Sequence, residues 1–298
     1  MSDKELASSV VRYLHGLLQR EEDNYDEAFV PEPFAGLPVE VLIACTEDEY
    51  VFASLVSNWN YSNPMPEAVR TKILTASESV RCQYAHKSQY EPVPPDVWDL
   101  VGDTYPSVRR ALVGIQTPVD ILVKLATDPD EEVRKDVARY SSKLPKECVL
   151  KLSSDLSKEV RKEVAYRCGD DELILELLDD DEAIVRQHAI SGLGRTGSGS
   201  ISLDQKISEA FDKHIHDIDE DVRANIARTV WASPSAWDVL SRDVSNKVRL
   251  GVAYNKKTPV EVLTRLSKDA DLHIASRAAM TLGLIPEGCI GNQGRPLT

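Results

Sequence analysis

The chain has 298 residues, and its content of 42% hydrophobic and 28% charged residues is typical of a soluble globular protein rather than a disordered one. Its 35 basic and 49 acidic side chains give a formal net charge of −14, which repels DNA, RNA and anionic membranes and attracts basic partners. The five cysteines contain no C-x-x-C pair, which argues against a zinc centre, an iron–sulfur centre and a disulfide framework.

The first predicted element lies within residues 1–36 and is a capping helix followed by an acidic loop. Ser2 or Asp3 is a suitable N-cap, and four apolar side chains share one helical stripe: Leu6, Val10, Leu14 and Leu17. This end of the chain lacks the features of a signal peptide, and no apolar stretch approaches ~20 residues. We therefore expect a cytoplasmic protein without a membrane-spanning helix.

A short block then recurs nine times, and its clearest copies read D-x-x-x-x-V-R-x-x-V-A, as at Asp128 to Ala138. A period of 25 to 29 residues indicates an array protein, in which each repeat buries its apolar face only by stacking on its neighbours. One interval is longer, at 37 residues, and contains the Gly/Ser-rich residues 192–200. The Val of the block, or its counterpart, stands at Val51, Val80, Val108, Val133, Val160, Val185, Val222, Val248 and Ile274.

Each repeat is predicted to hold a short first helix, such as PVDILVKLA, and a longer second helix, such as DPDEEVRKDVARY. The second helix is expected to begin at the Asp of the block, because Asp is a preferred N-cap and Pro129 after Asp128 suits the first helical position. Within this helix Val133, Val137 and Ala138 form a single apolar stripe.

An aspartate stands six residues before the arginine in most repeats, and the arginine is expected to reach a capping Asp of its own or an adjacent repeat. The pattern predicts a structural ladder of charge-assisted hydrogen bonds rather than a catalytic role. Its predicted members are Asp103, Arg109, Asp128, Arg134, Asp155, Arg161, Asp180, Arg186, Asp217, Arg223, Asp243 and Arg249, with Asp269 at the same position in the last repeat.

The runs TPVEVLTRLSKDADLHIASRAA, TPVDILVKLATDPDEEVRKDVA and KVRLGVAYN resemble the leucine-rich repeat variant pattern, and Asn58 and Asn255 fall where that pattern closes with Asn. The Asp–Arg spacing also resembles the short form of the HEAT repeat, as in LLDDDEAIVRQHAISGLGRTG. The resemblance covers roughly residues 37–285 and implies an all-α fold, an α-solenoid of about nine short helical pairs forming a HEAT- or armadillo-like superhelix. Some relatives carry a clustered-cysteine metal centre; this chain has no such cluster, so no cofactor is expected.

The predicted organisation follows from these patterns. Repeats 1–6 occupy residues 37–191, a Gly/Ser-rich insertion occupies 192–205, repeats 7–9 occupy 206–285, and residues 286–298 form a loose tail. The first and last repeats carry Phe52 and Ala275 in place of the arginine, as expected of terminal repeats with one face in solvent.

Two motifs could indicate chemistry, but each is better explained by the structure of the repeats. Gly192, Gly194 and Gly197 match G-x-G-x-x-G, but a helix rather than a strand precedes them, which favours an inter-repeat loop over a nucleotide site. His214 and His216 do not share a helical face, so His214, in a position otherwise filled by Leu, is expected to be partly buried and hydrogen-bonded rather than a metal ligand. No nucleophile with its base is visible, and neither a catalytic nor a metal site is predicted.

A recognition surface is predicted on the second helices, which usually line the concave wall of such solenoids. The position five residues after the arginine is variable, aromatic or basic: His86, Gly114, Arg139, Tyr166, Ser191, Arg228 and Tyr254. The predicted partner-binding residues are Arg139, Tyr166, Arg228, Tyr254, His86, Lys135 and Lys162. The structural alternative is that these bases complement the helix dipole and pair with acids one turn away.

The function predicted is non-enzymatic: a scaffold that binds another protein, of basic character, through the concave face, with no nucleic acid and no membrane as partner. An immunity-type or antagonist protein that neutralises a basic toxin or nucleic-acid-binding protein is a narrower form of it. A HEAT-like DNA-repair glycosylase is disfavoured because it needs a basic groove, and lyase roles of short HEAT-repeat proteins rest on fold analogy alone. The alternative is that the acidic charge only keeps the protein soluble and has no role in binding.

Overall fold

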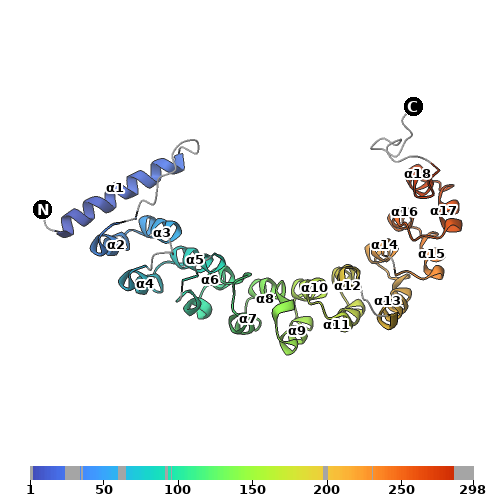
Figure 1. The fold of residues 1–298 in the computed structure, drawn as a ribbon, viewed down its shortest axis with the longest axis horizontal. Helices are drawn as coiled ribbons and strands as arrows, with labels where there is room; N and C mark the ends of the chain where they lie inside the picture. Colours follow the sequence, from blue (N-terminus) through green and yellow to red (C-terminus); the bar gives the residue numbers. More distant parts are fainter. Residues whose placement is uncertain are drawn as a thin grey trace. The chain divides into compact units, whose positions relative to one another are not determined.

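The computed structural model describes residues 3–23, 34, 36–59, 65–90, 93–94, 96–196, 201–229 and 231–284. Every regular element in these ranges is a helix. The chain divides into two units, Met1–Pro145 and Lys146–Thr298, which we call the N-terminal and C-terminal units. Each unit is an array of helical pairs, so the fold is all-α and of the solenoid type (Figure 1).

The N-terminal unit begins with the long helix α1 (Asp3–Asp23) and continues with four helical pairs. The pairs are α2 (Val39–Cys45) with α3 (Glu49–Asn58), α4 (Glu67–Ile73) with α5 (Glu78–His86), the 3-10 helix η2 (Val97–Gly102) with α6 (Pro106–Ala111), and α7 (Val119–Leu125) with α8 (Glu131–Ala138). Short 3-10 helices, η1 (Lys87–Gln89) and η3 (Ser141–Lys143), follow α5 and α8.

The C-terminal unit consists of five further pairs. They are α9 (Lys146–Ser153) with α10 (Lys158–Arg167), α11 (Asp171–Glu176) and its 3-10 extension η4 (Leu177–Asp179) with α12 (Ala183–Thr196), α13 (Ile201–His214) with α14 (Glu220–Arg228), α15 (Pro234–Leu240) with α16 (Asn246–Tyr254), and α17 (Val260–Leu266) with α18 (Leu272–Thr281).

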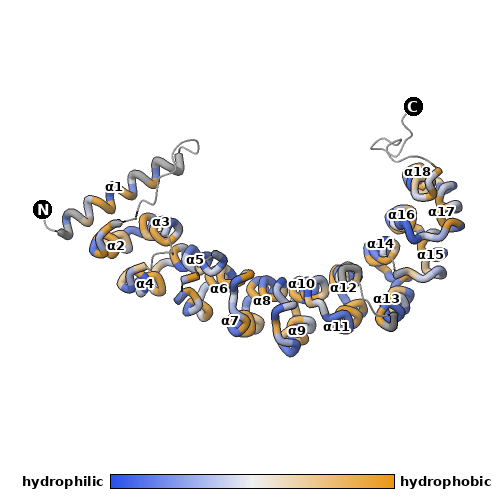
Figure 2. The backbone as a smooth tube through the Cα atoms, viewed as in Figure 1, coloured by the Kyte–Doolittle hydropathy of each residue, from blue (hydrophilic) through white to orange (hydrophobic). Residues whose placement is uncertain are grey.

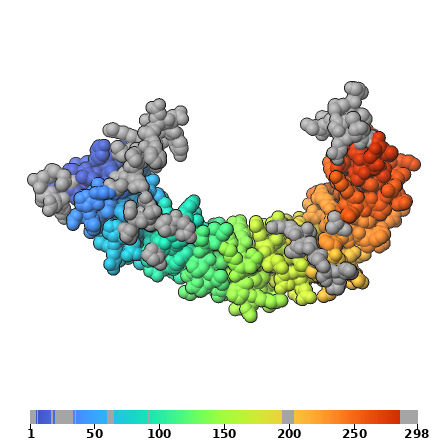
Figure 3. Space-filling view, viewed as in Figure 1, coloured from blue at the N-terminus to red at the C-terminus, as the bar shows by residue number. Residues whose placement is uncertain are grey.

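Stacking of neighbouring pairs provides the core of each unit. The nine Val or Ile residues that mark the repeat are at most 1% exposed, and each buried side chain of this kind contributes roughly 1.5–3 kcal/mol. Second helices pack against the next second helix, as α14 does against α16 and α16 against α18. Apolar and polar stretches alternate within the helices (Figure 2), and neighbours in sequence remain neighbours in space within each unit (Figure 3). A seven-residue helix is unstable alone, so this stacking maintains it.

Helix α1 covers the first pair, packing on α2 and α3. Its buried edge is Ala7, Leu14 and Leu18, whereas Val10 is half-buried. The predicted stripe is therefore rotated by about one residue, with Leu14 common to both. The side chains of Leu6 and Leu17 lie outside the described part, as does the acidic loop that was predicted to follow the helix.

The predicted start of the second helices is wrong. These helices begin three residues after the repeat Asp: α8 starts at Glu131 with Asp130 as N-cap, so Asp128 and Pro129 precede the helix. The insertion predicted at 192–205 is helical at both ends, because α12 runs to Thr196 and α13 starts at Ile201. Much of the extra length of this repeat lies in α13, which has 14 residues where α15 and α17 have 7.

Among the described residues, no helix is both long enough and apolar enough to cross a membrane. The predicted C-terminal tail, residues 286–298, lies outside the described residues.

Candidate functional site

Five repeat arginines each contact two aspartates, one in their own repeat and one in the next: Arg109, Arg161, Arg186, Arg223 and Arg249. Arg161 donates from Nε and Nη2 to the two carboxylate oxygens of Asp180, at 2.7 and 2.9 Å. Its Nη1 donates to the main-chain oxygen of Asp155, six residues earlier, at 2.8 Å. One guanidinium therefore closes its own inter-helix turn and joins that turn to the next.

The same bidentate contact recurs in both units. In the N-terminal unit it joins Arg81 to Asp103 and Arg109 to Asp128, and in the C-terminal unit Arg161 to Asp180, Arg186 to Asp217, Arg223 to Asp243 and Arg249 to Asp269. Arg81 is a member that the sequence prediction omits, because Thr75 stands where the aspartate is expected. Arg134 donates to the main-chain oxygens of Asp128 and Pro129, at 2.7 and 3.2 Å.

The ladder aspartates do not cap the second helices. Their carboxylates instead close the turn that precedes each of these helices. Asp128 Oδ1 accepts from the main-chain N–H of Asp130 at 2.9 Å, and Asp130 in turn caps α8 through the N–H groups of Glu132 and Val133. Burial raises the pKa of Asp180, but hydrogen bonds from Arg161 and the Glu182 N–H outweigh it, and the net pKa is lowered. The Asp180 carboxylate is therefore held as a hydrogen-bond acceptor between two repeats.

A side-chain contact joins the exposed faces of neighbouring second helices at two junctions of the C-terminal unit, α10–α12 and α16–α18. Counting from the buried Val or Ile of a repeat as zero, the side chain at position 6 contacts the side chain at position 3 of the next repeat. The ring of Tyr166 meets the edge of His188 at a centroid distance of 5.9 Å, and the guanidinium of Arg277 lies 4.0 Å from the ring centroid of Tyr254. We call this exposed surface of α10, α12, α14, α16 and α18 the second-helix face.

Glycine and arginine continue the same row between the two tyrosines. Gly251 stands at position 3 of its repeat, and a Cβ placed there would lie 3.6 Å from Cγ of Arg228 at position 6 of the preceding repeat. Arg228 and Ser191 are exposed, Tyr254 is 45% exposed, and Tyr166 is half-buried. The predicted residues Tyr166, Arg228 and Tyr254 thus belong to one row; His188 and Arg277 are additional members.

Three of the other predicted binding residues, Lys135, Lys162 and Arg139, have ion-pair partners one turn away. Lys135 pairs with Glu132 at 2.5 Å, and Lys162 pairs with Glu159; both pairs lie one turn apart in the same helix. Arg139, exposed at the C-terminal end of α8, pairs with Asp136 at 2.9 Å. His86 is exposed at the end of α5. These pairs match the structural alternative to partner binding, in which the basic residues pair with acids one turn away.

Acidic side chains concentrate on two neighbouring turns of the C-terminal unit, before α12 and before α14. The buried pair of Arg186 and Asp217 joins these turns. Asp181 and Glu220 are exposed there, and the side chains of Asp179 and Glu182 are 76% and 46% exposed. We call these four residues the acidic edge.

His214 lies in the same region as a partly buried side chain beside two aspartates. Its Nε2 is 3.2 Å from Asp179 Oδ1 and its Nδ1 is 3.7 Å from Asp217 Oδ2, and its side chain is 14% exposed. Within the described ranges, no group of three or more His, Cys, Asp or Glu side chains is arranged to hold a metal ion. Gly192 and Gly194 of the G-x-G-x-x-G match lie inside α12 rather than in a loop.

The comparisons with known proteins concern the fold alone. No protein-family model matches the chain, and none of the curated proteins is similar to it. Among solved structures, a leucine-rich repeat variant with a repetitive structural motif is 21% identical, covering 68% of this chain and 84% of its own, with a TM-score of 0.36.

Two designed proteins are similar in the same way. Computationally designed armadillo repeat proteins for modular peptide recognition are 17% identical, covering 78% of this chain and 98% of theirs, with a TM-score of 0.31. A designed armadillo repeat protein in complex with the peptide (KR)4 is 18% identical, covering 84% and 95%, with a TM-score of 0.23. The chain is thus similar to helical repeat proteins of the leucine-rich repeat variant and armadillo types.

Proposed function

We propose that the chain is a non-enzymatic scaffold that binds a basic segment of another protein along the second-helix face of its C-terminal unit. The observation that carries the proposal is the contact between positions 6 and 3 of successive repeats. It orients Tyr166 and Tyr254 against the neighbouring helix, and Arg228 stands at the same repeat position between them. A row of preorganised side chains at repeat spacing suits an elongated segment, since little side-chain entropy is lost on binding.

The tyrosines and the acidic edge favour a cationic partner. The ring of Tyr254 already accepts the guanidinium of Arg277 on one side while remaining 45% exposed. An exposed aromatic ring attracts Lys or Arg side chains of a partner in the same way. The acidic edge lies in the same unit, and the net charge of −14 attracts such a segment at long range.

The fold is one that proteins commonly use to bind peptides and other proteins, and one designed armadillo protein of similar fold is in complex with the peptide (KR)4. We use that likeness only to choose a peptide for the binding experiment. An antagonist of a basic toxin or of a nucleic-acid-binding protein is a special case of the proposal.

The test is a titration of a fluorescein-labelled (Lys-Arg)4 peptide with the full chain, followed by fluorescence anisotropy. We expect saturable binding at low ionic strength that weakens as salt screens the charges. Tyr166→Ala and Tyr254→Ala are each expected to weaken binding about fivefold, the loss of one exposed cation–π contact. Tyr90→Ala is the matched control, because Tyr90 is 66% exposed on the N-terminal unit.

Two outcomes would overturn the proposal. One is that both tyrosine variants bind the peptide as tightly as the Tyr90→Ala control, which would reduce the interaction to unspecific attraction between opposite charges. The other is that a polyglutamate peptide of equal length binds as well as the basic one.

A further inference from the structure

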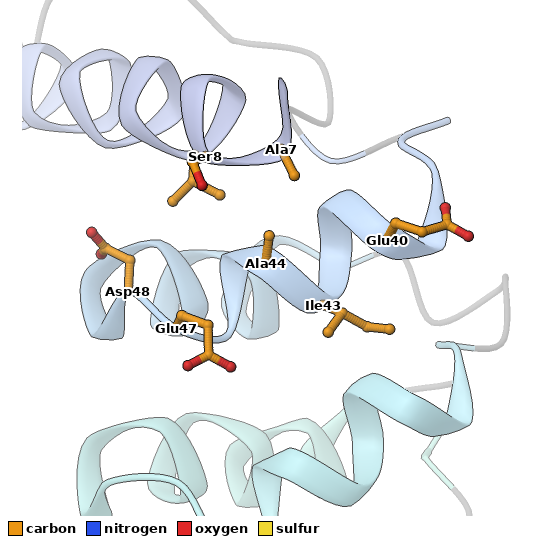
Figure 4. A pocket seen from close by; sticks show the side chains of 8 residues that line it. Ala7, Ser8, Glu40, Ile43, Ala44, Glu47 and Asp48 are labelled. Carbon is orange, nitrogen blue, oxygen red and sulfur yellow. The ribbon is translucent and has the colours of Figure 1, made fainter. Parts of the chain in front are cut away.

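A groove opens between the capping helix α1 and the first helix of the first repeat, α2. Its volume is about 850 Å³. Its walls are apolar and small, with Ala7 and Val11 on α1 and Ile43 and Ala44 on α2. Figure 4 shows Ala7 pointing from α1 toward α2 and Ala44 pointing back toward α1, so the two helices face each other across short side chains.

The groove is open because Ala44 has a short side chain. The position of Ala44, one before the last buried apolar residue of the first helix, is basic in four other repeats: Lys72, Lys124, Lys151 and Arg265. Lys72 and Arg265 reach acids associated with the preceding first helix, with Nζ to Glu47 at 2.6 Å and Nη2 to Asp238 at 2.9 Å. In the first repeat α1 stands where a preceding repeat would be, and alanine replaces the base.

Three carboxylates surround this apolar floor. Figure 4 shows Glu40 at one end of the groove and Glu47 and Asp48 at the other. Asp48 caps α3 by accepting a hydrogen bond from the Val51 N–H at 3.0 Å, and its other carboxylate oxygen lies 2.8 Å from Nδ1 of His15. Glu47 forms an exposed ion pair with Lys72. Among the described side chains none forms an ion pair with Glu40. The rim therefore carries more negative than positive charge.

We infer that this groove binds a helical segment of a basic protein, with an apolar side chain on the floor and a Lys or Arg at each end. Glu40 lies in the first turn of α2 and Glu47 in the turn after its end, so the two carboxylates flank a seven-residue helix about 10 Å long. Two bases seven residues apart on a bound helix match that length, and the residues three and four after the first base face the same side. The net charge of −14 disfavours a second copy of this chain as the occupant. The inference is independent of the second-helix face, because the groove lies wholly in the N-terminal unit.

The probe is a fluorescein-labelled, alanine-based helical peptide with two lysines seven residues apart and two leucines between them. We expect it to bind the full chain in anisotropy titrations at low salt. Ala44→Lys is expected to weaken binding at least tenfold, because it installs the base that other repeats carry, filling the floor and opposing the lysines. Val239→Lys is the matched control, since Val239 occupies the same repeat position on α15 and is 36% exposed.

A second pair of variants tests the charge without filling the groove. Glu40→Gln is expected to weaken binding severalfold, and Glu261→Gln, the same position of the last repeat on α17, is expected to leave it unchanged. Thermal unfolding of each variant confirms that the fold is retained. Equal binding by Ala44→Lys and Val239→Lys would overturn the inference, as would equal binding of a peptide with glutamates in place of both lysines. Tyr254→Ala, which tests the proposed function, is expected to have no effect on this probe.

Discussion

Arg109 donates two hydrogen bonds to the carboxylate of Asp128, from Nε at 2.6 Å and from Nη2 at 2.7 Å. The two residues belong to adjacent repeats, and their side chains are 9% and 4% exposed. The Arg109 Nη1 donates to the main-chain oxygen of Asp103 at 2.6 Å. The pair therefore fixes the spacing of two repeats, with a hydrogen bond from each guanidinium nitrogen and to each carboxylate oxygen, the geometry under which a buried ion pair is tolerated.

Replacing Arg109 by alanine is expected to lower the free energy of unfolding by about 3–5 kcal/mol, because the Asp128 carboxylate stays buried without its partner. Arg110→Ala is the matched control. Its guanidinium pairs with Asp136 at 2.8 Å, but the Arg110 side chain is 41% exposed, so a loss of about 0–1 kcal/mol is expected. Urea unfolding followed by circular dichroism measures both. Equal losses would mean that the ladder contributes no more than a surface pair.

The ladder also predicts how stability depends on pH. Burial raises the pKa of Asp243, but hydrogen bonds from Arg223 and the Ser245 N–H outweigh it and leave the pKa below its ordinary value; the same holds for Asp217. A carboxyl group with a depressed folded-state pKa stabilises the fold above its unfolded-state value of about 3.9, and this contribution is lost as pH falls through the folded-state pKa. The unfolding temperature should change little from this source above pH 5 and fall steeply below about pH 4.

Asp243→Asn isolates one of these groups. Asparagine is uncharged at every pH, so the variant is expected to be less stable than the wild type at pH 7. Near pH 2, where the aspartate is protonated, the two proteins should have similar stability. Thermal unfolding at a series of pH values gives both curves. Parallel curves across the whole range would show that Asp243 has the same pKa in both states.

The repeat architecture was predictable from the sequence because its signals are local and recur. Val133, Val137 and Ala138 are fully buried, and the apolar stripe that they form recurs at the same positions in the other second helices. The helix start was misplaced for a physical reason. Asp is a good cap at either of two nearby positions, and only the arginine of the preceding repeat decides that Asp128 takes the guanidinium while Asp130 takes the cap.

The second-helix face was less accessible to prediction. Tyr166 and Tyr254 stand out in one repeat position, but their neighbours His188 and Arg277 stand in another. Which positions meet depends on the rotation and spacing of neighbouring helices, and no single repeat encodes that relation. The groove beside α1 depends on Ala44 replacing a base, a departure that is visible only once the first helices are aligned by their buried residues.

Cysteine reactivity provides a further test of the packing near α1. Burial raises the pKa of the Cys45 thiol to about 11, and the charge of Asp48 adds to the effect. The thiolate is the reactive form, so Cys45 is expected not to react with Ellman's reagent at pH 8 in the folded protein. Cys45→Ala should therefore leave the native-state labelling unchanged and lower the total by one thiol after unfolding. A smaller native-state signal would show that Cys45 is accessible.

Gly192 is expected to be irreplaceable for a steric reason that concerns the contact of α10 with α12. A Cβ at Gly192 would lie 2.3 Å from the main-chain oxygen of Ala165, and a backbone atom cannot move aside as a flexible side chain would. Gly192→Ala should force the two helices apart and cost about 1–3 kcal/mol, as overpacking of a core does. Gly16→Ala is the control, because a Cβ there meets nothing within 4 Å and alanine favours a helix by up to about 1 kcal/mol over glycine. The two substitutions are thus expected to shift the unfolding temperature in opposite directions. A neutral effect at Gly192 would mean that α10 and α12 have room to separate, and that close approach of second helices is not what holds this part of the array together.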